Sequence, residues 1–338
     1  MHRMNGHAFR IPAAAVLALV LVLSGCGRNV GWMIKPVPLG EELAESVLYS
    51  DARWLDSAKI VVIDVDGLLT NQRRKGLFGL GQNPVSLFVE KIDKAQRDPD
   101  VRAMIVRINS PGGGVTASDI MYRRLVQFRQ ARGVPVIAII EDVGASGGYY
   151  IACGADVILA HPTTVTGSIG VIVQTVSFAG TMRLLGITSQ GVTSGKHKDM
   201  ASPFKPLDKE DLAILQDMVN AFHARFVHIV ASGRPKMKKE KVEALADGRV
   251  YTARQALAHG LIDGLAYMDD AIVRAKADAH LERAKVVMYH RPFGGKSSFY
   301  SAAAPPAPQG QGNLLNVSVG QLPGFDQPRF LYLWTGRR

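Results

Sequence analysis

The N-terminal hydrophobic run of this chain is too short to span a bilayer. Ile11–Leu23 covers roughly 13 residues, whereas a transmembrane helix needs about 20. Arg3 and Arg10 precede the run, and the small residues Ser24 and Gly25 follow it, which is typical of a cleaved export signal. We therefore predict that residues 1–25 are a signal peptide, with an uncleaved signal anchor as the alternative.

Cysteine is scarce, with two residues in 338. Leu23-Ser24-Gly25-Cys26 resembles the bacterial lipobox, in which the cysteine is acylated and becomes the first residue of a lipoprotein. Acylation of Cys26 leaves Cys153 alone, so the mature chain has no intramolecular disulfide and depends on its core for stability. Lipid anchor and signal anchor both place the folded part outside the cytoplasm on a membrane surface.

Aromatic residues are also few, at 7% of the sequence, and their scarcity helps to decide which partner the basic charge of the chain could attract. The formal net charge is +11, and removal of residues 1–25 takes away two arginines and no acid, which leaves 11 − 2 = +9. The densest basic groups, residues 72–75 and 234–239, contain no aromatic side chain that could stack on a base. The pattern argues against nucleic acid as a partner and favours attraction to anionic lipid.

Short apolar runs alternate with helical patterns through the middle of the chain. Continuous β-branched runs without polar alternation indicate strands that are buried on both faces, so we predict an α/β domain with a largely parallel sheet and flanking helices. The predicted organisation is a tether and N-terminal segment over 26–55, one domain over 56–300, and a linker with a C-terminal tail over 301–338. The predicted strands are Ile60–Ile63, Ala103–Val106, Val136–Ile140, Val157–Leu159 and Ile169–Val173.

Three local signals refine this organisation. Asp208 is a predicted N-cap of a long helix, and Gly260 a predicted left-handed helix end before a short strand. The tail Phe330–Trp334 has strand propensity, and the sequence leaves open whether it adds to a sheet edge or lies across a groove.

Ser146 is the first candidate for chemistry, because it lies between a buried strand and a helix start in the small-residue stretch Gly144–Gly148. Such an elbow pushes the side chain outward and lets a substrate backbone approach. The amide of Gly147 would lie at a helix N-terminus, where it favours a developing oxyanion. A glycine-rich turn with an incidental serine remains an alternative at this point.

A second glycine turn, Asn109–Gly114, follows the predicted strand Arg102–Ile108. At the carboxyl end of a parallel strand it faces the crevice where α/β proteins bind ligands, and the Gly113 amide is placed to complete an oxyanion hole. The turn lacks the lysine and the serine or threonine of a nucleotide phosphate loop.

A serine nucleophile needs a base, and two kinds are available. Gly144–Gly148 formally fits the elbow of α/β-hydrolases, which predicts Asp263 with His280 or His290. A lysine in the polar loop Thr193–Phe204 can serve instead, if burial lowers its pKa enough to provide a neutral amine. The residues alone leave both options open.

At these residues the chain resembles the signal peptide peptidase A family, the bacterial peptidases with a serine–lysine dyad, along most of its length. The resemblance rests on five ordered motifs: Asn109–Gly113, Ala145–Tyr150, Thr166–Val171, Lys198-Asp199 with Ser202-Pro203-Phe204, and Gly248–Thr252.

The resemblance implies a site without metal or cofactor. Ser146 is its nucleophile, Lys198 its general base, and Ser168 orients the lysine, while the amides of Gly113 and Gly147 form the oxyanion hole. Lys196 is then a bystander.

The resemblance also implies a fold similar to the Clp protease subunit and the crotonases, with oligomerisation helices. Short members of the family form closed homo-oligomeric rings in which serine and lysine meet across a subunit boundary. We accordingly expect an exported serine endopeptidase at a membrane surface that degrades remnant signal peptides and other extended apolar peptides. The alternatives are an exported histidine-dependent esterase, a crotonase-like acyl-CoA enzyme, which has no reason to be exported, and an inactive binding scaffold.

Overall fold

The computed structural model describes residues 42–72, 75–76, 79–80, 82–291 and 330–335. The predicted signal peptide, the lipid site at Cys26 and most of the segment 301–338 lie outside these residues, so the expectations for them stay predictions. Within the described ranges, no helix combines the length and the apolar character needed to cross a bilayer.

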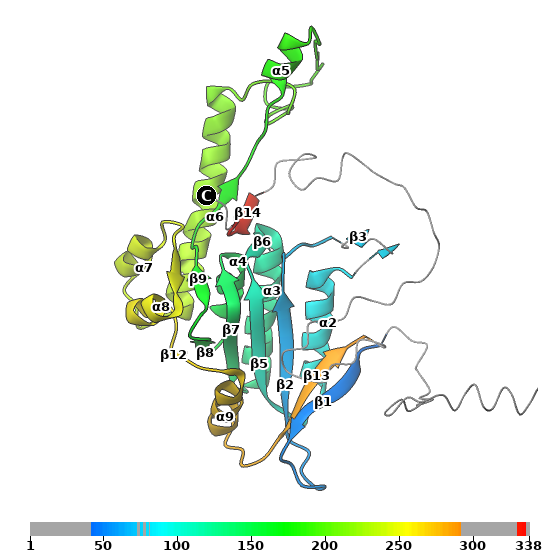
Figure 1. The fold of residues 1–338 in the computed structure, drawn as a ribbon, viewed down its shortest axis with the longest axis vertical. Helices are drawn as coiled ribbons and strands as arrows, with labels where there is room; N and C mark the ends of the chain where they lie inside the picture. Colours follow the sequence, from blue (N-terminus) through cyan, green and yellow to red (C-terminus); the bar gives the residue numbers. More distant parts are fainter. Residues whose placement is uncertain (1–41, 73–74, 77–78, 81, 292–329, 336–338) are drawn as a thin grey trace, which may run out of the picture. The chain divides into compact units, whose positions relative to one another are not determined.

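A mostly parallel sheet forms the centre of the domain (Figure 1). Its strand order is β1-β13-β2-β5-β7-β8-β12; β1 pairs antiparallel with β13, β9 continues beside β7, and β11 pairs antiparallel with β9. The strands are β1 Ala44–Ser50, β2 Lys59–Asp66, β5 Val101–Ser110, β7 Val136–Ala145, β8 Val157–Ala160, β9 Val165–Gly167, β11 Val250–Thr252, β12 Gly264–Leu265 and β13 Lys285–His290.

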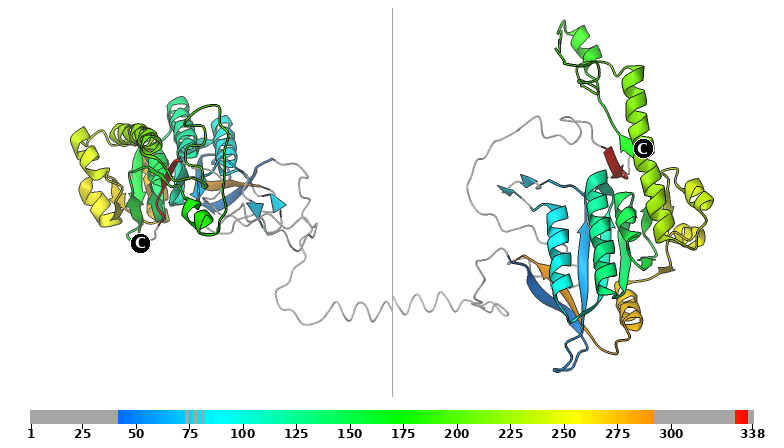
Figure 2. Two further views of the ribbon diagram at one scale, coloured as in Figure 1. Left: turned by 90° about the horizontal axis from the view of Figure 1, so that it is seen from above. Right: turned by 180° about the vertical axis from the view of Figure 1, so that it is seen from behind.

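Helices cover both faces of this sheet (Figures 1 and 2). Val61, Ile63 and Val65 of β2 belong to the core that also contains side chains of α2, α3 and α6, whereas Ile60 and Val62 belong to the core beneath α9. Consecutive residues of β2 thus point into opposite cores, which explains the unbroken apolar runs. The helices are α2 Pro84–Arg97, α3 Val115–Arg132, α4 Gly147–Ala152, α5 Ala179–Leu184, α6 Lys209–Gly233, α7 Lys239–Leu245, α8 Ala253–His259 and α9 Met268–Asp278.

The α/β class with a largely parallel sheet is confirmed, and so are the local signals at two helix ends. The Asp208 side chain accepts a hydrogen bond from the Asp211 amide at the start of α6. Gly260 ends α8 at a φ of 85°, and β12 follows four residues later. β1, which pairs with β13, lies within the segment 26–55 that the sequence assigns to the tether.

The predicted strand Ile169–Val173 is wrong in its extent and its burial. Only Ile172–Val173 forms a strand, β10, and it is partly exposed. The chain leaves the central sheet after β9, and β10 joins a separate three-stranded sheet in the order β10-β14-β6. In this small sheet β6 is Gly112–Gly114 and β14 is Phe330–Leu333. A further two-stranded pair joins β3 Lys75–Gly76 to β4 Gly79–Leu80.

An arm made of α5, the following loop and the first half of α6 extends away from the central sheet (Figure 1). No residue of α5 is buried, and the buried apolar side chains of α6 lie mainly in its second half. The arm leaves several large apolar side chains exposed: Leu184, Leu185, Ile187, Val192, Phe204, Leu212 and Met218.

Candidate active site

Ser146 occupies a sharp turn between β7 and α4. Its backbone has φ 52° and ψ −114°, a conformation that costs energy for a residue with a side chain. Two hydrogen bonds hold it: the Ser146 amide donates to the Gly167 carbonyl (2.7 Å), and the Tyr150 amide donates to the Ser146 carbonyl (2.8 Å). The elbow expected from sequence is therefore present at the carboxyl end of a central strand.

The Ser146 side chain is buried, which the sequence-based picture of an outward-pointing hydroxyl did not anticipate. The residue is 1% exposed, and among the described residues its Oγ finds no hydrogen-bond partner. β14 lies against the same turn: a Cβ added at Gly147 would be 3.2 Å from the Tyr332 carbonyl oxygen. A strand from the far end of the chain thus covers the serine elbow.

Gly113 lies on β6, beside the serine elbow. The Gly112 carbonyl accepts from the Leu69 amide (2.9 Å), and the Gly114 amide donates to the Leu69 carbonyl (2.8 Å). Because the polar groups of an extended strand alternate in direction, the amide of Gly113 faces away from Leu69. A Cβ at Gly112 would lie 2.6 Å from the Gly147 nitrogen, so the two glycine turns touch.

Ser168 follows β9, directly beside the nucleophile candidate. Ala145 on β7 pairs with Gly167 on β9, so the next residues, Ser146 and Ser168, are neighbours across the sheet. Ser168 has φ 51° and is 7% exposed, and its amide donates to the Arg249 carbonyl (2.8 Å). The structure therefore brings together four of the predicted site residues.

Lys198 lies apart from this group, in the loop between α5 and α6 on the arm, where it is exposed. Two neighbouring lysines are ion-paired: Lys196 with Glu210 (2.5 Å), and Lys205 with Asp199 (2.7 Å). A hydrogen bond to the carboxylate raises the pKa of each of these two lysines and so keeps it charged. In the described part of the chain, no hydrogen bond or ion pair engages the Lys198 ammonium.

The histidines of the hydrolase alternative do not meet Ser146. His290 on β13 binds the Ser46 hydroxyl and the Arg291 carbonyl, both at 2.7 Å, and β2 and β5 separate β13 from β7. His280 precedes β13 and so lies at the amino ends of the parallel strands, opposite to the elbow. The proposed third member, Asp263, is paired with Arg234. Among the described residues, neither His280 nor His290 therefore forms a triad with Ser146 and Asp263.

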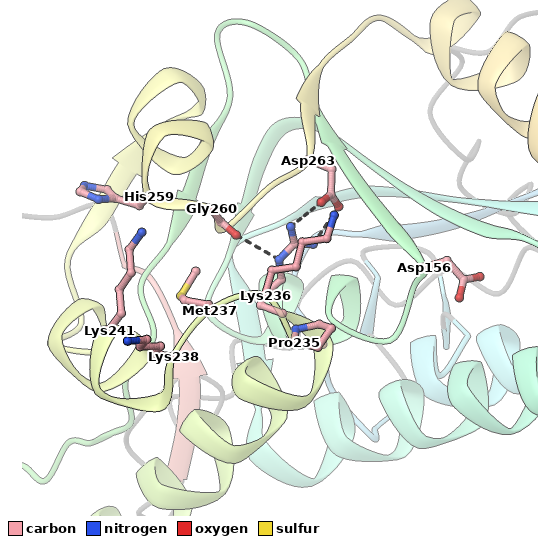
Figure 3. Close-up of a pocket in the computed structure, with 11 residues that line it drawn as sticks. Asp156, Pro235, Lys236, Met237, Lys238, Lys241, His259, Gly260 and Asp263 are labelled. Atoms are coloured by element: carbon pink, nitrogen blue, oxygen red, sulfur yellow. Dashed lines mark hydrogen bonds and ion pairs between the residues drawn. The ribbon is translucent and has the colours of Figure 1, made fainter.

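A separate pocket of about 340 Å³ lies near the start of α7 (Figure 3). Lys238, Lys241 and His259 line it, together with the ion-paired side chains of Arg234 and Asp263. Asp263 of the hydrolase alternative lines this pocket, but Ser146, Ser168, Lys198 and the two glycine turns do not, so it is distinct from the serine elbow.

Sequence reasoning missed an aromatic cluster behind the elbow. Tyr150 lies one helical turn after Ser146, and its ring stacks on Tyr332 at a centroid distance of 5.1 Å and contacts Phe226 at 5.0 Å. In the sequence, Tyr150 is one member of the motif Ala145–Tyr150, and the motif by itself assigns no role to its side chain. Its spacing of four residues from the nucleophile is the signal that points to a side chain beneath the site.

Comparisons with known proteins identify a peptidase family. The model of peptidase family S49 matches residues 128–282. A putative signal peptide peptidase SppA from Enterococcus faecium is 33% identical over 299 residues, which cover 87% of this chain and 86% of that protein. Protease 4 of Salmonella typhi is 36% identical over 193 residues, which cover 57% of this chain and 31% of that protein.

Among solved structures, a 1510-N membrane-bound stomatin-specific protease aligns with a TM-score of 0.41 and 18% identity. The alignment covers 65% of this chain and 84% of that one.

Proposed function

This chain belongs to peptidase family S49 and is a serine protease of the signal peptide peptidase SppA type, and we propose that Ser146 is its nucleophile and Lys198 its general base. The observation that carries the proposal is the meeting of Ser146, Ser168 and the two glycine turns at the carboxyl edge of the sheet. Among the described residues of the arm loop, Lys196 and Lys205 are ion-paired with carboxylates, whereas no carboxylate binds Lys198, so its amine is available to contact Ser146 of a second copy.

The proposed reaction is acyl transfer to serine followed by hydrolysis. Neutral Lys198 takes the proton of the Ser146 hydroxyl as its oxygen attacks the peptide carbonyl, and the Gly113 and Gly147 amides stabilise the oxyanion. Lys198 then gives the proton to the leaving amine, which leaves an ester on Ser146. Water, deprotonated by the same lysine, hydrolyses the ester and regenerates the enzyme. Ser168 would hold the lysine amine in the required direction.

The dyad is completed, in this proposal, by a second copy of the chain in a homo-oligomeric ring. Lys198 lies on an arm that exposes large apolar side chains, including Leu184 at 87% and Val192 at 97%, and burial of such a surface favours association. Docking of the arm over a neighbour's Ser146 would desolvate the lysine and lower its pKa toward the working range.

Mixing two inactive variants tests both the dyad and its assembly. Ser146→Ala and Lys198→Ala proteins are each expected to be inactive on a fluorogenic apolar peptide. Co-refolded in equal amounts, they should recover about a quarter of wild-type activity, because random assembly pairs an intact serine with a neighbour's intact lysine at that fraction of sites. Activity of the Lys198→Ala protein alone would contradict the base, and a mixture that stays inactive would contradict the shared site.

The N-terminal pattern and the family support a proposal for the substrates and the location of the enzyme. We place the enzyme on the extracytoplasmic side of a membrane, anchored by lipid on Cys26, where it degrades remnant signal peptides and other extended apolar peptides. Cys26→Ser should move the protein from the membrane fraction to the soluble exported fraction and remove its labelling by a palmitate analogue. Unchanged fractionation would contradict the lipid anchor.

A further inference from the structure

The pocket near the start of α7 collects basic side chains from three segments of the chain (Figure 3). Lys236 and Lys238 come from the loop after α6, Lys241 from α7, and His259 from the end of α8. In Figure 3 the Lys241 ammonium points toward His259, whereas Lys236 lies on the other side of Met237. Lysines therefore border this space of about 340 Å³ from two sides.

The two acidic side chains of the pocket are already paired with arginines. Asp263 accepts hydrogen bonds from both terminal nitrogens of Arg234, at 2.8 and 2.5 Å, and a third from the Ile158 amide at 2.8 Å. Asp156 pairs with Arg129 at 3.3 Å. Because each carboxylate faces an arginine, neither has its charge left to neutralise a lysine of the pocket.

The lysines themselves lack such partners. Within the part of the chain that the structure describes, no ion pair or hydrogen bond engages the side-chain nitrogens of Lys236, Lys238 and Lys241. The adjacent Lys239, in contrast, is paired with Glu243. Three positive charges that border one space repel one another, and an anion placed among them is attracted by all three. The charge of the pocket is therefore matched to an anionic ligand.

The segment that carries these lysines is held in place by the protein itself. The Arg234 amide donates to the Val230 carbonyl at the end of α6 (2.8 Å), and the Arg234 guanidinium donates to the Gly260 carbonyl (3.1 Å). The Met237 amide donates to the Arg234 carbonyl (2.9 Å), and Val242 of α7 is fully buried. A ligand therefore needs to order little backbone, which keeps the entropic cost of binding low.

Two apolar side chains, Pro235 and Met237, line the same space. A free inorganic anion would leave them in contact with water. A ligand in which a phosphate adjoins a glyceryl ester and an acyl chain can contact the lysines and the apolar side chains together. The tether proposed at Cys26 would also keep such a ligand at a high local concentration.

We propose that this pocket binds the phosphate group of an acidic phospholipid, with Lys236 and Lys241 as its main contacts. Phosphate oxygens accept strong hydrogen bonds from ammonium groups, and the glyceryl part would lie against Met237. The choice of a lipid rests on the membrane location in the proposed function, whereas the anion site rests on the pocket alone. The bound lipid is a second, reversible membrane contact in addition to the lipid on Cys26.

Calorimetric titration of the full chain in nonionic detergent tests the proposal. The probe is dihexanoyl-phosphatidylglycerol, whose short chains keep it soluble, and the heat of its entry into empty micelles is subtracted. Lys236→Gln/Lys241→Gln should weaken its binding about 10- to 30-fold, because each lysine near an anionic lipid contributes about a factor of five. The same variant should keep peptidase activity on a soluble peptide within about twofold of wild type, since exposed charges this far from the site are screened.

Two further variants control for charge. Arg102→Gln/Arg123→Gln removes the same charge from two exposed positions outside the pocket and should change affinity by less than about twofold. Lys236→Arg/Lys241→Arg keeps the charge and should stay within about threefold of wild type. All of these side chains are exposed, and a thermal melt checks that each variant is folded.

Each other outcome overturns a stated part of the proposal. Equal losses in the Lys236→Gln/Lys241→Gln and Arg102→Gln/Arg123→Gln proteins would show an effect of net charge and overturn the pocket. Dihexanoyl-phosphatidylcholine that binds as tightly as the phosphatidylglycerol would overturn recognition of an acidic head group. Glycerol phosphate or inorganic phosphate that binds as tightly would overturn the lipid and make a soluble phosphate the ligand.

The titration involves no turnover, so a wrong assignment of Ser146 or Lys198 leaves its result unaffected. Loss of the predicted lipid binding in a protein with normal peptidase activity would overturn this inference and leave the proposed function intact.

Discussion

Replacement of Gly113 by alanine should stop catalysis, whereas the same replacement at the neighbouring Gly114 should not. A Cβ at Gly113 would lie 2.1 Å from the Leu69 carbonyl oxygen and 2.6 Å from the Leu69 nitrogen, both backbone atoms. Since real Cβ contacts are essentially never under 3.0 Å, β6 and Leu69 must separate by about 0.9 Å. At Gly114 the nearest atoms would be 3.8 Å away, which is ordinary contact.

The displacement moves the Gly113 amide, which is a proposed oxyanion donor, and this determines the expected loss in kcat. Loss of one oxyanion donor lowers kcat by about 10²–10³, or about 2.7–4 kcal/mol of transition-state stabilisation. A shift of about 1 Å in a positioned group has an effect of the same size. We therefore expect Gly113→Ala to lower kcat at least about 100-fold, and Gly114→Ala to stay within about threefold of wild type.

The assay combines steady-state hydrolysis of a fluorogenic peptide with a thermal melt of each variant. The melt shows whether Gly113→Ala is folded, and only a folded variant with lost kcat supports the geometry. Two results refute the reasoning: Gly113→Ala with near-normal kcat, or equal losses for Gly113→Ala and Gly114→Ala.

Three further substitutions test the effects assigned to charged side chains on stability and activity. Burial raises the pKa of Glu141 above its ordinary 4.5, so its ionisation costs stability above that pH; Glu141→Gln should leave Tm unchanged at pH 4 and raise it at pH 8. Although burial opposes its ionisation, hydrogen bonds from Arg234 lower the pKa of Asp263, so its stabilisation is complete above 3.8 and lost as pH falls through the lowered value. Asp263→Asn should therefore reduce the unfolding free energy at pH 7 by about 1–3 kcal/mol, with the difference shrinking in acid denaturation below pH 3.8. Lys196→Ala removes an exposed ion pair and should keep kcat/KM within about twofold of wild type in the peptide assay, and a large loss would contradict the choice of Lys198.

Much of the fold could be predicted from local patterns. The runs around Ile60 and Val136 belong to strands buried on both faces, and such strands require continuous apolar sequence. Asp208 and Gly260 act on backbone groups within a few residues of themselves. The local sequence is therefore sufficient to predict their roles at the helix ends.

Pairing between strands that are distant in the sequence could not be predicted from local patterns. β10 was expected in the central sheet, but its partner is β14, more than 150 residues away, and a strand of two residues has too little pattern to specify a neighbour. The sequence also leaves open whether the tail adds to a sheet edge or lies across a groove, and the structure pairs it with β6 and β10 as the middle strand of the small sheet.

Local sequence patterns predict one part of the candidate site, and the family resemblance predicts the other part. The elbow at Ser146 and the turn at Gly113 follow from glycine placement after predicted strands. Ser168 looked like a serine in a tight turn, and only the resemblance singled it out before the register placed it beside Ser146. The role proposed for Lys198 depends on its surroundings in the proposed ring, and the sequence of the loop alone does not specify those surroundings.

Labelling with a fluorophosphonate probe tests the central claim most directly, because the probe reacts only with an activated serine. Intact-mass and peptide mass spectrometry should find one adduct, on Ser146, in the wild type and in Lys196→Ala. The adduct should be absent from Ser146→Ala and slowed at least about 100-fold in Lys198→Ala, since an unassisted hydroxyl is a weak nucleophile. Rapid labelling of Ser146 in the Lys198→Ala protein, or an adduct on another serine, would contradict the account.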